Sequence, residues 1–247
     1  MIGSKFSYDQ AWQDAVSIAR SHTSLLLAIT GVFILLPQFG QGLFFPPPEI
    51  EQFDQSAIEA WNTYFSQNFV ALFLLNLPVA LGQAAILSLI LDPVKPTVGQ
   101  SLSVAASLLL SVVVLGFAAN LIIFGGLFLF IVPGIYLLGR LSVAAAAQMA
   151  ERISNPIIAI RRSIELTANN GFQIAGLIIL IVVVGYIFAM AIGAVVGIVL
   201  TLIVPSVAAS AAIALLQAAL AALTLLVLTV LSAAIYRQCM GGTKQAI

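Results

Sequence analysis

The feature that most limits what this chain can fold into is the length of its uncharged stretches. Lys95 and Arg140 enclose 44 consecutive residues without a charge, and Glu165 and Arg237 enclose 71. Charged residues make up 7% of the chain and hydrophobic residues 62%, whereas soluble domains carry about 25% charged residues. So few charges cannot cover a surface in water, and the sequence therefore predicts a chain whose main solvent is lipid.

The number of membrane crossings follows from the lengths of these stretches. A hydrocarbon core of about 30 Å needs about 20 helical residues, so the first stretch crosses twice, with a turn expected at Gly125 and Gly126. The second stretch has its strongest break at Pro205. Three short crossings are the alternative there, but two keep the cations after the last span on the side of the others. The sequence thus predicts an all-α polytopic membrane helix bundle with transmembrane helices at about 24–45, 68–91, 102–124, 127–150, 171–204 and 207–237.

Amphipathic helices are expected at the membrane surface. Residues 1–23 contain Ser7 and Gln10 at the spacing of a capping box and Trp12 on an apolar face; a disordered polar tail is the alternative. A second interfacial helix is expected at 155–168, capped by Ser154 or Asn155, and residues 238–247 form a tail. The first span reads as retained rather than as a signal peptide, with Pro37 near a kink. The charged residues of the first loop are all acidic. A short helix is possible at 56–65.

The positions of the basic residues predict the orientation. With six crossings, one side of the membrane receives all nine: Lys5, Arg20, Lys95, Arg140, Arg152, Arg161, Arg162, Arg237 and Lys244. Basic residues concentrate on the cytoplasmic side of bacterial membranes. Both termini are therefore expected in the cytoplasm and the acidic first loop outside.

The central segment 133–171 is the largest feature expected on the cytoplasmic side. Arg140 either faces a polar interior, with Glu151, Glu165 or Asp92 as a partner, or snorkels to the surface if the fourth span ends near Ser142. In the interfacial helix, isoleucines alternate with Arg161, Arg162 and Glu165 at helical spacing. These arginines anchor the chain to anionic headgroups, or dock a particular lipid or protein.

The same segment resembles a known family. The matching positions are Pro133, Gly134, Tyr136, Arg140, Leu141, Glu151, Arg162, Ser163, Leu166 and Thr167. They follow the pattern of the bacterial glycerophosphoryl diester phosphodiesterase membrane domain and of YciC-like membrane proteins. The resemblance implies about six helices in the bacterial inner membrane and no catalysis, since the soluble phosphodiesterase barrel of some relatives is not in these residues. A proline common in the family is missing, because residues 144–147 are alanines.

Motifs for catalysis, cofactors and metals are missing from the sequence, which predicts no enzyme, no cofactor and no metal. The single histidine, His22, reads as an interfacial polar residue rather than a ligand or base. Cys239 is either a site of lipidation or reaction, or a small residue tolerated at a helix end. No predicted span contains Asp or Glu, so a carboxylate proton relay is not expected. The net charge of zero gives no reason to expect nucleic acid binding.

Two functions remain open from sequence. Gly193 and Gly197 form a GxxxG pattern that suits helix packing within one chain, with a membrane-protein partner or in a homo-oligomer. The first hypothesis is a non-enzymatic inner-membrane protein acting through lipids or partners in the envelope. The alternative is a permease for a small or lipidic solute, whose route would be lined by Arg140 and the intramembrane amides Asn76, Gln83, Asn120 and Gln217.

Overall fold

The computed structural model describes residues 6–48, 50, 54–94, 96–203 and 206–244. Within them the chain is all-α and has no strand. Six helices in these residues are long and apolar enough to cross a membrane, so the predicted all-α class and the six apolar helices are confirmed. The expectations for Lys5, Lys95 and Pro205, and for part of the acidic first loop (49 and 51–53), fall outside the described residues.

The N-terminal part forms α1 (Tyr8–Ser21) and a first apolar helix built of α2 (Thr23–Thr30), the π-helical turn η1 (Gly31–Leu35) and α3 (Leu36–Phe44). Ser7 caps α1 by accepting from the N–H of Gln10. The π-turn lies directly before Pro37, which cannot donate to the preceding turn. Leu36 N–H donates to the Gly31 carbonyl, so the wider turn satisfies backbone groups that lipid could not.

The second apolar helix, α4 (Gln55–Leu91), is one continuous element. The sequence had suggested a short helix at 56–65 separate from a span starting near 68, and this division is wrong. Asp54 caps the single helix by accepting from the N–H of Ala57, and the backbone hydrogen bonds of α4 continue through the polar residues between the two expected pieces.

The next apolar stretch forms α5 (Val98–Ser107) and α6 (Leu109–Leu129). The chain therefore breaks at Leu108, inside the predicted third span, and Thr97 and Gln100 form a capping box at the start of α5. The turn expected at Gly125 and Gly126 is also wrong. Neither glycine has a positive φ; α6 runs through both, and the turn comes at Phe130, whose backbone is extended.

The central segment contains α7 (Ile131–Leu141), α8 (Ala144–Ala150) and α9 (Pro156–Leu166). The predicted fourth span is thus interrupted at Ser142 and Val143. Asn155 rather than Ser154 caps α9, accepting from the N–H of Ile157 at 2.9 Å. Pro156 follows as the first helical residue, where its missing N–H is not needed.

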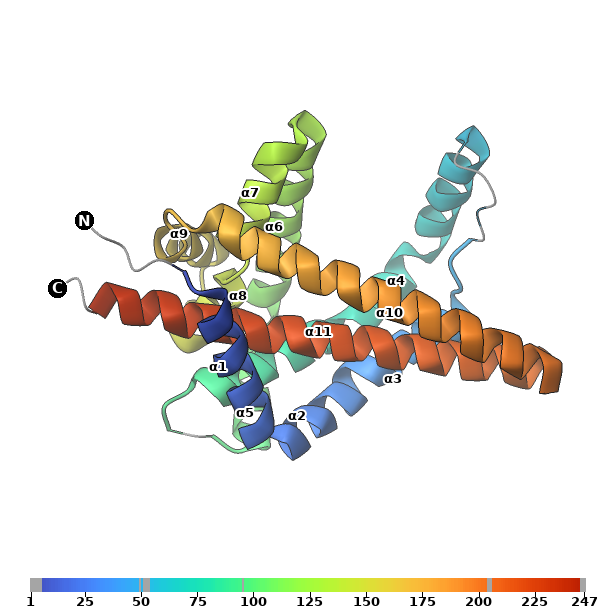
Figure 1. Ribbon diagram of the computed structural model, residues 1–247, viewed down its shortest axis with the longest axis horizontal. Coiled ribbons are helices and arrows are strands. Elements are labelled where there is room, and N and C mark those ends of the chain that lie inside the picture. The colour runs from blue at the N-terminus through green and yellow to red at the C-terminus, as the bar shows by residue number, and fades with distance from the viewer. Residues whose placement is uncertain (1–5, 49, 51–53, 95, 204–205, 245–247) are drawn as a thin grey trace.

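Two long helices complete the chain, α10 (Gly171–Ile203) and α11 (Ser206–Lys244), and they run side by side as a hairpin. The buried core lies at one end of this pair, where α11 meets α1, the last turns of α4, and α8 (Figure 1). Ile86, Ile174, Leu231 and Ile235 are fully buried there. The α6–α7 hairpin projects from this end to the side of the α10–α11 pair (Figure 1).

A close crossing of α7 and α10 generates the first prediction. A Cβ added at Gly139 would overlap the Gly171 carbonyl and the Ala175 backbone, neither of which can move aside cheaply. We expect Gly139→Ala to lower the free energy of unfolding by about 1–3 kcal/mol, measured by thermal unfolding in detergent. Gly116→Ala in α6 is the control: its added methyl meets nothing within 4 Å, and stability should be unchanged or higher by up to about 1 kcal/mol. Equal effects of both variants would contradict the proposed contact.

Candidate functional site

The cytoplasmic end predicted from sequence contains a polar cluster built around the last turns of α11. Tyr236 donates to Glu151 at the end of α8, and Arg237 donates to the Ile90 carbonyl at the end of α4. Gln238 donates to the Ser7 carbonyl and to the Gln10 side chain of α1, and Met240 accepts from α9. Residues 236–240 of this one helix thus bond to four other elements.

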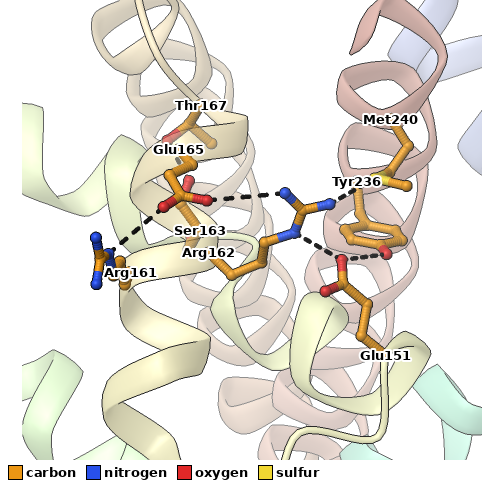
Figure 2. A network of polar contacts seen from close by, with 8 residues as sticks. All are labelled: Glu151, Arg161, Arg162, Ser163, Glu165, Thr167, Tyr236 and Met240. Carbon is orange, nitrogen blue, oxygen red and sulfur yellow. Dashed lines mark hydrogen bonds and ion pairs between the residues drawn. The ribbon is translucent and has the colours of Figure 1, made fainter. Parts of the chain in front are cut away.

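Glu151 and Arg162 form the centre of this cluster (Figure 2). Arg162 Nε lies 2.8 Å from Glu151 Oε1, and the Tyr236 hydroxyl donates to the same oxygen at 3.0 Å. Arg162 also reaches the sulfur of Met240 at 3.3 Å. The side chains of Arg162 and Glu151 are 28% and 30% exposed, and the hydrogen bond to Glu151 raises the pKa of the Arg162 guanidinium. The Arg162 side chain therefore joins α9, on which it lies, to α8 and α11.

Arg161 has a different environment from its neighbour. Its side chain is 82% exposed and, among the residues that the structure describes, forms its ion pair with Glu165, one helical turn later, at 3.5 Å. Exposed pairs of this type contribute about 0.3–0.5 kcal/mol. Of the two arginines expected to meet headgroups, Arg161 is the one whose charge is open to a ligand.

Arg140 lies in the last turn of α7, directly before the break at Ser142. Its guanidinium stands over the ring of Tyr136, 5.5 Å from the centroid, a cation–π contact. Its backbone carbonyl accepts from the hydroxyls of Ser163 and Thr167 of α9. The predicted motif residues therefore do meet, but through the main chain of Arg140.

The three carboxylates expected to pair with Arg140 form ion pairs with other arginines. Glu151 and Glu165 pair with Arg162, and Asp92 pairs with Arg152 at 3.0 Å. The backbone N–H of Val94 and then the Arg152 guanidinium hold the pKa of Asp92 below its ordinary value. None of the ion pairs found among the described residues includes Arg140. A carboxylate partner for Arg140 is thus a wrong expectation.

The remaining motif glycines have separate surroundings. Gly134 is buried against the α6 backbone, where a Cβ would clash with Leu127, and Pro133 before it is exposed. In the GxxxG pattern, Gly193 has nothing within 4 Å and Gly197 meets Ile213 only at an ordinary contact distance. Gly193 therefore packs against no neighbouring helix among the described residues, whereas Gly197 faces α11.

Sequence reasoning missed the residues that close the cluster, namely Tyr236, Arg237, Gln238 and Met240. An aromatic residue followed by a cation at the end of an apolar run is typical of a membrane interface, and this signal was present. It also missed Gln148, which is fully buried in α8 and donates to Ser111 of α6 at 2.6 Å.

An apolar groove of about 520 Å³ opens between α1, α10 and α11. Its rim is formed by Tyr8, Asp9 and Trp12 of α1. Its walls come from the facing sides of the long helices: Leu177, Leu180, Ile181, Val184, Gly185, Phe188, Leu220, Leu223, Thr224 and Val227. Two further cavities lie along α1 and between α6, α7, α10 and α11, and Arg140 lines none of the three.

No group of three or more His, Cys, Asp or Glu within the described residues could hold a metal ion. The apolar helices and the polar cluster at one end define a multi-pass α-helical membrane protein. Comparisons with protein-family models, with curated proteins and with solved structures found no match to this chain.

The Glu151–Arg162 pair generates the second prediction. Glu151→Gln keeps an oxygen for Tyr236 but removes the nearer of the two carboxylates that pair with the half-buried Arg162, leaving only Glu165 at 3.8 Å. We expect the free energy of unfolding in detergent to fall by about 1–2 kcal/mol, between the values for exposed and buried pairs.

Glu165→Gln is the matched control, because Glu165 is 55% exposed and its loss should cost at most about 0.5 kcal/mol. If both variants lowered stability equally, the central role of Glu151 would be refuted.

Proposed function

We propose that this chain is a non-enzymatic protein of the bacterial inner membrane that binds a phospholipid through the groove between α1, α10 and α11. The length of the groove is the main support for this proposal. From Leu177 to Phe188 its α10 wall extends 11 residues, about 16 Å at 1.5 Å per residue. One leaflet of a hydrocarbon core of about 30 Å is about 15 Å deep. The groove therefore has the length of one acyl chain.

The rim of the groove fits the headgroup layer. Tyr8 and Trp12 are half-exposed on α1, and such side chains place an apolar ring toward lipid and a polar group toward water. The wall below them has Thr224 as its one residue with a polar side chain. Polar atoms at one end and hydrocarbon along the length match a lipid rather than a water-soluble ligand.

Two exposed cations favour lipids with anionic headgroups. Arg161 is 82% exposed and Arg20 lies on the exposed side of α1. An arginine beside an anionic leaflet contributes about 1 kcal/mol. Arg161 serves this role better than Arg162, whose guanidinium is held by Glu151.

Both termini are proposed to lie in the cytoplasm. The support is that α1, α9, the end of α4 and the end of α11 meet in one polar cluster, which places Arg152, Arg162 and Arg237 together. The resemblance of residues 133–171 to the phosphodiesterase membrane-domain family supports the same membrane and a role in the envelope. The surface of α10 at Gly193 leaves room for a partner helix or a second copy.

The permease alternative gains no support from the site. Arg140 lines none of the three cavities. The amides of Asn76 and Asn120 donate to carbonyls of their own helices, which is a structural use rather than the lining of a route. The lipid-binding proposal is therefore preferred.

Filling the groove tests the proposal. Val184→Trp places a large ring where the acyl chain would lie and removes room for two or three methylenes, each contributing about 0.8 kcal/mol. We expect phospholipid retained through purification, measured by native mass spectrometry, to bind about 30-fold more weakly.

Val183→Trp is the matched control. Val183 and Val184 are 46% and 43% exposed on the same helix, but only Val184 lines the groove. Equal loss of lipid in the two variants, or retention in both, would reject the groove as the binding site.

Orientation is tested independently by reporter fusions. A fluorescent protein that folds only in the cytoplasm should light up when fused after Lys244. An alkaline phosphatase fused near Pro47 should be active in the periplasm. The reverse pattern at either position would overturn the proposed arrangement of the cations.

A further inference from the structure

The turn between α6 and α7 is unlike a loop in water. Residues 127–132 read LFLFIV, without a polar side chain, and Phe128 to Val132 are 63–95% exposed. The connection between α3 and α4, by contrast, includes glutamates, a glutamine and an aspartate. Leaving five large apolar side chains in water would forfeit about 1.5–3 kcal/mol each.

We propose that α6 and α7 form a re-entrant hairpin: it enters the membrane from the side of the polar cluster, turns within the lipid, and returns. Its apolar tip is surrounded by the hydrocarbon of the leaflet next to that side. On this arrangement four helices cross the membrane, and α6 and α7 do not.

The backbone of the turn suits a position in lipid, where unbonded polar groups are costly. Phe130 N–H donates to the Gly126 carbonyl, and Gly134 N–H donates back to the Phe130 carbonyl. Pro133, the third residue of α7, has no N–H to satisfy. The turn thus uses one extended residue and leaves few free donors.

The two helices hold each other without polar side chains. A Cβ added at Gly126 would lie 3.0 Å from the Cα of Gly134 and would clash with Leu137. Small residues that let backbones touch are the usual means of packing helices in lipid. The hairpin is therefore a stable unit even where lipid surrounds it.

The length of α7 argues against a crossing. From Phe130 to Arg140 the chain covers ten residues, about 15 Å, which is half of the hydrocarbon core. The base of the hairpin is fixed at the polar cluster, since the Arg140 carbonyl bonds to α9 and Ser111 near the start of α6 bonds to the Ser154 carbonyl. The other arm, α6, covers 18 residues and about 27 Å from Ser111 to Leu129, but the hairpin is tilted away from the α10–α11 pair (Figure 1), so its tip stays inside the hydrocarbon core.

The contacts between α7 and α10 agree with a tip that stays inside the bilayer. It contacts α10 near the start of that helix, through Tyr136 on Phe172 and Gly139 on Gly171 and Ala175. Beyond these residues the hairpin leaves the α10–α11 pair to one side (Figure 1). Because zero and two crossings are both even, the sides assigned to all other segments, and to every basic residue, stay the same.

Spin-label depth distinguishes the two arrangements. Single cysteines replace Leu129, Ile135 and Leu138 in a Cys239→Ala background, and each is labelled and reconstituted in lipid vesicles. For a re-entrant hairpin, collision with oxygen relative to a water-soluble nickel chelate should rise steadily from 138 through 135 to a maximum at 129. A maximum at 135, with 129 near water again, would mean that the helices cross and would overturn the proposal.

Reactivity in cells provides the second measurement, in the same background. A membrane-impermeant maleimide should label Ser56→Cys from outside and Ala168→Cys only in inverted vesicles, and it should label Leu129→Cys from neither side until detergent is added. Labelling of Leu129→Cys from the side of Ser56 would show a full crossing. Labelling from the side of Ala168 would place the tip in the cytoplasm. Either result would overturn the proposal.

Discussion

The end of α11 is the contact on which the rest of the structure depends. Lipid offers no partner for a polar group, so polar side chains can join helices strongly only where water begins. Tyr236, Arg237, Gln238 and Met240 bond to α8, α4, α1 and α9. Elements distant in sequence are thereby held at one end, and the small side chains of α8 allow the helices to approach closely beneath them.

Because the helices are bonded together at one end, side chains are buried at that end and exposed at the other. The core lies next to the polar cluster, where Ile86, Leu231 and Ile235 are fully buried, while Phe128 and Leu202 at the far ends are 95% and 81% exposed. In water such an arrangement would expose large apolar surfaces, but in lipid the hydrophobic effect no longer drives helices together. Helix ends can therefore separate without cost once one end is held.

The sequence was a good guide to elements and a poor guide to contacts. Long uncharged stretches and caps such as Asn155 predicted the apolar helices and the helix α9, because these signals are local. Contacts between distant residues leave no such signal: Tyr236 and Glu151 are 85 positions apart, so Arg162 looked available for lipid although Glu151 holds it. The glycine pair at 125 and 126 looked like a turn, yet Gly126 serves close packing against Gly134, which residue type alone does not distinguish.

The break between α7 and α8 connects the packing to the membrane position of Arg140. A guanidinium at the middle of a span would cost about 2.5–3.5 kcal/mol on insertion scales. With α7 ending at Leu141 and the Arg140 carbonyl accepting from both Ser163 and Thr167, Arg140 lies beside the polar cluster and needs no buried carboxylate. In the proposed arrangement, the re-entrant hairpin and the lipid groove both begin beside the polar cluster. In that arrangement the chain contacts the two leaflets unequally, with most of its specific surface in the leaflet next to its basic residues.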